Sequence, residues 1–343
     1  MLPYIARRLA LLPAILFGVT ALVFALAGQL SPGQRAALYV SDLPRSPDAV
    51  QRIIDRYGLE DPLPAQYARW LGQLARGNLG FSTTGKEPVA RVIARLLPAT
   101  LELALWACLP IVWVGVRLGI LAAVRHGGRV DQALRVCSTV GTSVPLYLVG
   151  LAAIMLFAAR LDWLPAGDRL SPALQIAADG PDWRAPTGMH TVDALVNGRG
   201  DVWLDAVRHL VLPVLSLAVV SWAYLLRVTR SSMLEALGQD YVRTALAKGV
   251  PRHAAIHAHA WPNARLPVAA LTGLTLVGLL GGVAIVETVF NWPGLGNRFV
   301  QAAVSLDVVT TLGLTLFGAV TVVLGNLVVD VASAWLDPRI RLS

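Results

Sequence analysis

The sequence predicts an all-α polytopic membrane protein with six transmembrane helices, and its composition and its apolar pattern both support this. Of the 343 residues, 55% are hydrophobic and only 15% are charged, which is outside the range of water-soluble domains. Six continuous apolar runs are long enough to cross about 30 Å of hydrocarbon as helices. They lie near residues 9–30, 99–124, 137–159, 209–227, 267–288 and 308–335. The runs do not alternate in polarity, which excludes barrel strands.

Basic residues between the spans predict which side of the membrane each segment faces. Short segments that stay in the cytoplasm are enriched in arginine and lysine. Arginines flank the first span, the turn between spans two and three, and the end of the last span: Arg7, Arg8, Arg125, Arg129, Arg135, Arg339 and Arg341. We therefore expect both termini in the cytoplasm. The net charge of +8 gathers at membrane borders rather than along a groove, so we expect no nucleic-acid partner.

The chain divides into four parts in this prediction. Residues 1–30 hold the first span. Its apolar run is longer than that of a typical signal peptide, and no clear A-x-A cleavage site follows it. Residues 31–98 form an extracytoplasmic insertion with helical pieces at 48–57 and 65–76, and long segments of this kind cross regardless of their charge. Residues 99–335 form the core, including an irregular outer cap over 161–208 with a short helix from Thr191. Residues 336–343 form a cytoplasmic tail.

A charged, helix-forming segment over residues 230–266 separates two apolar spans on the cytoplasmic side. Asp240 is a good N-cap for a short helix beginning at Tyr241, and Gly249 suits the left-handed position that ends it. Pro251 suits the start of a second helix, which would stop near Pro262.

This helix, corner, helix unit would present Tyr241, Ala245 and Lys248 on one face and project its glycine. Such a shape is suited to insertion into a groove of a partner protein. The residues alone leave a second interpretation open, in which the segment is an amphipathic linker lying on lipid headgroups.

The same segment resembles the EAA loop of permease subunits in ABC importers. Arg243-Thr244-Ala245 stand where that Glu-Ala-Ala would be, Gly249 is its glycine, and Trp261-Pro262 stand for its Leu-Pro. The similarity is closer to the dipeptide, oligopeptide and nickel permeases, and it extends along the chain. Further stretches that resemble this family are Tyr4–Leu9, Gly58–Leu63, Gly77–Ser82, Leu97–Ala104, Trp292–Gly296 and Leu336–Arg341.

The resemblance implies a type I ABC importer permease in a bacterial plasma (inner) membrane, with the large insertion after the first span. The chain would form half of a path for di- or oligopeptides and would not be an enzyme. It implies four partners besides the membrane: a second homologous permease subunit in a heterodimer, two ATPase subunits that bind ATP and Mg, and an extracytoplasmic solute-binding protein. It assigns coupling to the ATPase to Glu235, Asp240, Tyr241, Arg243, Thr244, Ala245, Lys248, Gly249 and Pro262.

Two kinds of alternative to this function are another solute and another class of transporter. Nickel or another peptide-like solute is the nearest alternative, but no histidine lies near the middle of a predicted span. A secondary transporter or channel would need a charged mid-membrane site, and the span centres hold few ionisable residues.

Acidic residues near the spans are candidates for function, because charges inside a membrane are costly. Glu287 lies at the outer end of the fifth span, where it is either part of a gate or a capping and packing residue. The candidate gate or external face comprises Glu287, Trp292, Pro293, Gly294 and Gly296. Arg117 is unexpected in the second span; we expect its side chain either to extend to the cytoplasmic surface or to meet a carboxylate, for which Asp330 is a candidate.

Two motifs resemble a phosphate-binding site and a metal-binding site, but each lacks a necessary residue. Residues 80–87 match a phosphate-binding loop up to Lys86, but Glu87 stands where Ser or Thr must hold Mg²⁺. His253, His257 and His259 include an i, i+4 pair of the kind that binds a metal on one helix face, but no cysteine is nearby and no third ligand has an obvious fixed geometry. We therefore expect no catalytic residue, metal site or bound cofactor in this chain.

Overall fold

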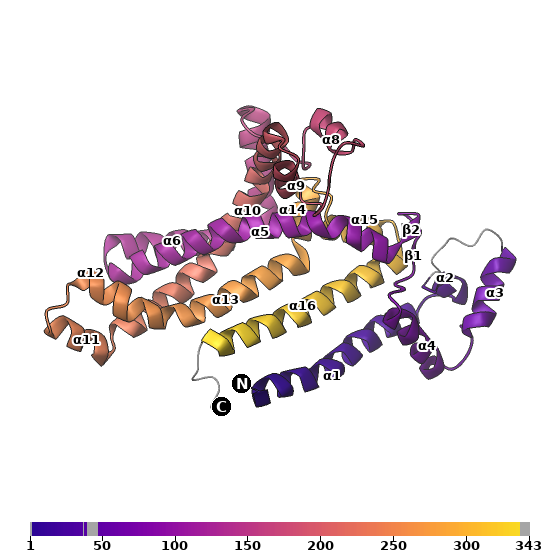
Figure 1. The fold of residues 1–343 in the computed structure, drawn as a ribbon, viewed down its shortest axis with the longest axis horizontal. Coiled ribbons are helices and arrows are strands. Elements are labelled where there is room, and N and C mark those ends of the chain that lie inside the picture. The colour runs from indigo at the N-terminus through magenta and orange to yellow at the C-terminus, as the bar shows by residue number, and fades with distance from the viewer. Residues whose placement is uncertain (1, 37, 40–46, 337–343) are drawn as a thin grey trace.

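The computed structural model describes residues 2–36, 38–39 and 47–336, and it confirms an all-α polytopic architecture. Five helical stretches in this part of the chain are long and apolar enough to cross a membrane. They are the 10–27 part of α1 (Leu2–Ala27), α5 (Val89–Val124), α10 (Gly200–Leu237), the stretch Arg252–Leu280 that contains most of α13 (Trp261–Gly282), and α16 (Val308–Leu336). The helices α1, α5, α13 and α16 extend along the long axis of the molecule (Figure 1). Of the predicted tail at 336–343, Leu336 is the last residue of α16, and the rest lies outside the described residues.

The third expected span is not one helix. It consists of α6 (Arg129–Ser143), followed by α7 (Leu146–Ala153) and the π-helix η1 (Ile154–Arg160), with a bend of 95° between the two parts. The expected continuous helix over 137–159 is therefore wrong. Val144 is extended, with φ −85° and ψ 126°, because a residue before proline avoids the helical conformation, and Pro145 begins the next helix. If the bent pair counts as one span, the total is six.

Other expected boundaries fall inside helices. Because α5 begins at Val89, the outer insertion and the second span share one helix, which continues through Pro98. Membrane helices tolerate internal proline, since neighbouring groups satisfy the freed carbonyls. Likewise α10 covers both the end of the outer cap and the first residues of the 230–266 segment. The fifth span ends at Gly282, and α14 (Ala284–Val289) is a separate short helix.

The outer insertion forms a small subdomain at one end of the molecule (Figure 1). It contains α2 (Pro32–Ala36), α3 (Pro47–Tyr57), α4 (Leu63–Ala75) and an antiparallel pair of short strands, β1 (Phe81–Ser82) and β2 (Glu87–Pro88). Phe81 pairs with Pro88, and Ser82 with Glu87. The helical pieces expected at 48–57 and 65–76 correspond to α3 and α4. Buried side chains of this subdomain, such as Leu59 and Trp70, join one apolar cluster with the start of α5 and with α16.

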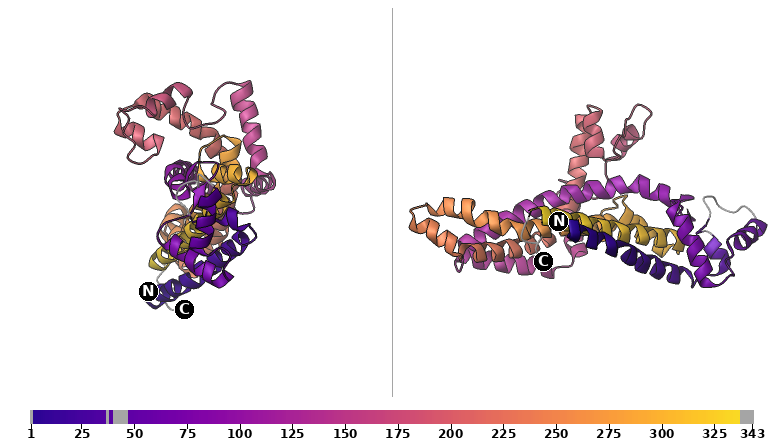
Figure 2. Two further views of the ribbon diagram at one scale, coloured as in Figure 1. Left: turned by 90° about the vertical axis from the view of Figure 1, so that its right-hand side faces the viewer. Right: turned by 60° about the horizontal axis from the view of Figure 1, so that its bottom comes forward.

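Short helices occupy the remaining segments. The outer cap contains α8 (Pro172–Ala178) and α9 (His190–Val196), which matches the short helix expected from Thr191, and it projects to one side of the bundle (Figure 2). After α14 comes α15 (Leu295–Val304). At the end of the molecule opposite α2–α4 lie α11 (Asp240–Ala247), α12 (Arg252–Ala254) and the π-helix η2 (Ala255–Ala260) (Figure 1).

Close helix contacts depend on small residues. At Gly119 of α5 an added Cβ would lie 2.5 Å from Thr229 Cβ of α10, and at Gly115 it would lie 2.6 Å from Leu225 Cβ. These distances are shorter than atoms tolerate, so the two backbones approach closely only because both positions are glycine. Helices in lipid associate mainly through such packing, since burial from water no longer drives them together.

We predict that Gly119→Ala lowers the free energy of unfolding by about 1–3 kcal/mol, because the new methyl group overpacks the α5–α10 contact. Gly278→Ala in α13 is the matched control, since an added Cβ there meets nothing within 4 Å. That control should be neutral or slightly stabilising, because alanine favours helix over glycine. Unfolding of both variants in detergent measures the difference. Equal stability of the two variants would contradict the packing assigned to Gly119.

Candidate coupling segment and external polar clusters

The start of α11 differs from the expectation by one residue. The N-cap is Gln239, which is extended at φ −74° and ψ 151°, and Asp240 is the first helical residue. The expected N-cap role of Asp240 is therefore wrong. Its carboxylate lies 3.4 Å from Arg243 Nη1 in a solvent-exposed pair. An acid in the first turn still interacts favourably with the helix dipole.

Gly249 ends α11 in the left-handed conformation that its position predicts, with φ +82°. The Gly249 N–H donates to the Leu246 carbonyl at 3.0 Å, and the Val250 N–H donates to the Ala245 carbonyl at 3.1 Å. This pair of hydrogen bonds is the Schellman motif, in which the turn satisfies the last free carbonyls of the helix. The corner is thus a defined structure and not a loose connection.

The second helix does not stop at Pro262. Instead α12, η2 and α13 follow without a break, and Pro262 lies in the first turn of α13. A proline inside a continuous membrane helix is tolerated where a local π-helical turn re-satisfies the freed backbone groups, and η2 is such a turn directly before it. The glycine corner is therefore connected to the fifth span by one continuous helix.

One face of α11 packs against the ends of the spans. Val242 and Ala245 are 2% and 7% exposed, and Val242 belongs to an apolar cluster with Met233 of α10 and Ile256 of η2. The expectation that Ala245 is presented together with Tyr241 is wrong, because Ala245 belongs to the apolar i, i+3 stripe. The other residues assigned to coupling are exposed, except the half-buried Pro262: Glu235, Asp240, Tyr241, Arg243, Thr244, Lys248 and Gly249.

Two polar contacts fix this end of the molecule. Arg230 of α10 donates to the buried Asp131 carboxylate of α6 at 2.6 and 2.8 Å. Asp131 also accepts from the Gly127 N–H at 3.0 Å, at the turn that begins α6. Arg252 donates to the Val124 carbonyl at the end of α5 at 3.3 Å. Sequence reasoning counted Arg230 only as a cytoplasmic charge and missed its partner, which lies 99 residues earlier.

Beyond the other end of α13, Glu287 is fully buried and caps a helix. It accepts hydrogen bonds from Thr100 Oγ1 at 2.7 Å and from the Asn297 N–H, in the first turn of α15, at 2.8 Å. Gly294 leaves room for this carboxylate, since an added Cβ would lie 2.2 Å from Glu287 Oε1. The geometry is that of the capping alternative, and a gate role for this region stays a prediction.

The turn around Trp292 is tied to α5 and to α14. Trp292 Nε1 donates to the Ala99 carbonyl at 2.9 Å, and the Trp292 N–H donates to the Glu287 carbonyl at 2.7 Å. Asn297 Nδ2 donates back to the Trp292 carbonyl at 2.9 Å. Trp292 is 1% exposed, whereas Pro293 is exposed on the rim of an outer cavity of about 500 Å³. The predicted residues of this turn therefore do come together.

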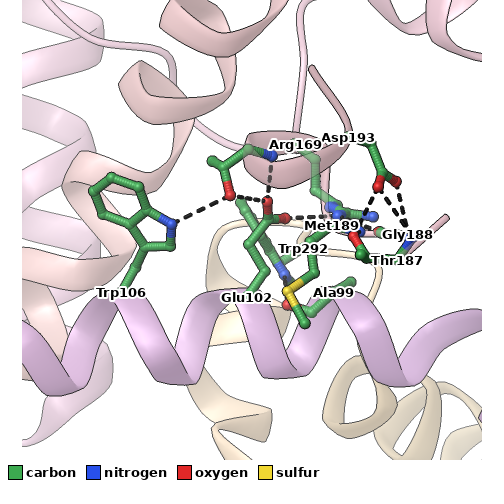
Figure 3. Close-up of polar contacts among 10 residues, drawn as sticks. Ala99, Glu102, Trp106, Arg169, Thr187, Gly188, Met189, Asp193 and Trp292 are labelled. Atoms are coloured by element: carbon green, nitrogen blue, oxygen red, sulfur yellow. Dashed lines mark hydrogen bonds and ion pairs between the residues drawn. The ribbon is translucent and has the colours of Figure 1, made fainter. Parts of the chain in front are cut away.

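A second buried carboxylate, Glu102 of α5, holds the outer cap (Figure 3). It accepts from the Thr191 N–H and hydroxyl, both at 2.7 Å, and pairs with Arg169 Nη2 at 2.6 Å. Arg169 also donates to the Gly188 carbonyl at 2.9 Å, and Trp106 donates to the Thr191 hydroxyl at 3.3 Å. Sequence reasoning placed Glu102 only within a family-like stretch and gave it no role.

A third carboxylate, Asp307, joins the β1–β2 hairpin to the start of α16. It accepts from the Ser82 hydroxyl, from the Thr84 N–H and hydroxyl, and from Thr310 at distances of 2.7 to 3.2 Å. Burial alone would raise the pKa of Asp307, but the hydrogen bonds from Thr84 and Thr310 hold it below its ordinary value. Residues 80–87, which resemble a phosphate-binding loop, form this hairpin.

Of the two alternatives for Arg117, the pair with Asp330 is not formed. The ion pairs among the described residues do not include this one. Arg117 is exposed and lines two neighbouring cavities between α5 and the α12–α13 helix.

We predict that Glu287→Ala lowers the free energy of unfolding by about 1–3 kcal/mol, because it leaves buried donors of Thr100 and α15 without an acceptor. Glu287→Gln should lose less, since its amide oxygen can still accept from the Asn297 N–H. Hydrogen exchange at residues 294–300 should accelerate strongly in the alanine variant and weakly in the glutamine variant. Asp201→Asn, at an exposed ion pair, is the control and should change neither quantity. Unchanged exchange in Glu287→Ala would contradict the capping role.

Comparison with known proteins gives consistent similarity over the whole chain. Residues 115–342 match the family described as binding-protein-dependent transport system inner membrane component. The chain is 40% identical to a di/tripeptide transport system permease protein of Pseudomonas aeruginosa over 341 residues, which is 99% of each chain. It is 35% identical to a dipeptide transport system permease protein of Escherichia coli, again over 99% of each chain. An oligopeptide transport system permease protein of Bacillus subtilis is 35% identical and is covered in full. The chain therefore belongs to the family of inner membrane components of binding-protein-dependent transport systems.

Proposed function

We propose that this chain is one of two homologous permease subunits of an ATP-driven importer for di- or oligopeptides in a bacterial inner membrane. The observation that carries the proposal is the similarity over 99% of the chain to permeases named for di/tripeptide and dipeptide transport. Family membership also favours this function over a secondary transporter or channel. Both termini would lie in the cytoplasm, in agreement with the arginines at the ends of the spans.

The α11 corner would be the surface that receives force from two ATPase subunits, which would bind ATP and Mg. Tyr241 and Leu246 are 40% and 45% exposed beside Arg243 and Lys248, and large apolar side chains exposed on an otherwise charged segment favour a protein contact. The buried Val242 and Ala245 give this surface a fixed base on the spans. The chain itself would supply the path and the lever.

A continuous connection between the two ends supports this mechanism. A displacement of α11 would move α12, η2 and α13 together, because they form one helix. At its outer end α13 is followed directly by α14, whose Glu287 holds the Trp292–Gly296 turn through α15. A solute-binding protein would dock on this outer side, so movement inside would reach the face where the solute is delivered.

We predict that Gly249→Val lowers solute-stimulated ATP hydrolysis in proteoliposomes about tenfold, because a left-handed valine costs about 1–2 kcal/mol and distorts the corner. Gly249→Asn is the matched control, since asparagine tolerates this conformation, and it should keep most of the stimulation. A Cβ at this position meets nothing within 4 Å, so neither variant disturbs packing.

Membrane insertion and copurification of the ATPase subunits should be measured beside hydrolysis. If Gly249→Val inserts and stimulates hydrolysis as the natural chain does, the corner is not the coupling element.

A further inference from the structure

A groove runs along α5 and the α12–α13 helix near the coupling segment. It consists of two cavities of about 650 and 470 Å³, which share Val116, Arg117 and Trp261 as lining residues. Because the cavities share one wall, they form a single groove. It extends from the cytoplasmic end of α5 into the part of α13 that lies in the fifth span.

The groove is basic toward the coupling segment and where the two cavities meet. Five exposed cationic or titratable side chains line it: Arg252, His253 and His257 in the first cavity, Arg265 in the second, and Arg117 in both. No carboxylate lines either cavity in the part of the chain that the structure describes. A guanidinium inside a membrane span is costly unless an anion or water meets it. Among the described residues, no carboxylate forms an ion pair with the arginines of the groove.

The other end of the groove is apolar and lies within the spans. It is lined by Val112 and Trp113 of α5 and by Val268 and Ala269 of α13. Trp113 is 65% exposed, so its large apolar ring is free to contact an apolar occupant of the groove. An occupant must therefore be anionic at one end and compatible with hydrocarbon at the other.

We propose that this groove binds an anionic phospholipid from the cytoplasmic leaflet. The phosphate would lie among Arg117, Arg252 and Arg265, whose guanidinium groups suit phosphate oxygens, and an acyl chain would lie along Trp113 and Val268. Basic pockets between membrane helices on the cytoplasmic side are a known form of lipid recognition. A protein segment is disfavoured as occupant because it would have to bring both carboxylates and an apolar face to the same border. The phosphate would be the anionic partner of Arg117. This lipid site does not depend on which solute is transported.

Quenching of tryptophan fluorescence by brominated lipids tests this proposal. The chain has ten tryptophans, so the groove signal is the difference between the natural chain and Trp113→Phe. Dibrominated phosphatidylglycerol should quench this component at lower concentration than dibrominated phosphatidylcholine. In the Arg117→Gln/Arg265→Gln variant, half-quenching by phosphatidylglycerol should need at least about tenfold more lipid, since each arginine near the surface contributes about 1 kcal/mol.

Arg227→Gln is the matched control, because Arg227 is an exposed span arginine outside the groove, 4.9 Å from the Tyr224 ring. It should stay within about twofold of the natural chain. The proposal is overturned if the two lipids quench the natural chain equally, or if the double variant responds as the natural chain does. The lipid comparison on the natural chain keeps the test decisive should the double variant fail to fold. The same quenching should also be measured in the transporter purified together with its partner chains. If phosphatidylglycerol no longer quenches the groove signal there, a protein covers the groove and the proposal is overturned.

Discussion

The need to satisfy backbone N–H groups where water is absent governs this structure. Inside a span the helix satisfies its own groups, but each helix that begins in the packed outer region exposes N–H groups that need an acceptor. Three buried carboxylates supply it: Glu102 for α9, Glu287 for α15 and Asp307 for α16. Each of them also binds a distant segment, so the same charges that complete the helix ends assemble the outer face.

The end of the molecule that carries α11 is built differently, and we propose that it is presented to a partner. A buried ion pair between Arg230 and Asp131 and a small apolar base fix its position, while the charged and aromatic side chains of α11 stay exposed. Continuity of α12, η2 and α13 connects this surface with the carboxylate-held turn outside. In this account the molecule is a continuous helical connection between two polar regions.

Local features of the sequence predicted much of this architecture. The apolar runs indicated the spans, and Gly249 could be predicted to be left-handed because a helix end of this type demands it. Proline was ambiguous: Pro145 begins a new helix after a 95° bend, whereas Pro98, Pro110 and Pro213 lie inside unbroken helices. Which prolines interrupt a helix depends on tertiary packing. The partners of the buried acids could not be predicted either, because Thr100 lies 187 residues from Glu287 and Thr191 lies 89 from Glu102.

Site-specific cross-linking tests the central claim, that α11 contacts an ATPase subunit, most directly. In a chain whose Cys108 and exposed Cys137 are replaced by serine, Tyr241→Cys should be joined to a copurifying ATPase subunit by a thiol-to-amine reagent. Lys86→Cys, in the hairpin at the opposite end, should give no such product. Absence of the product from position 241 while the ATPase copurifies, or its appearance from position 86, would contradict the account.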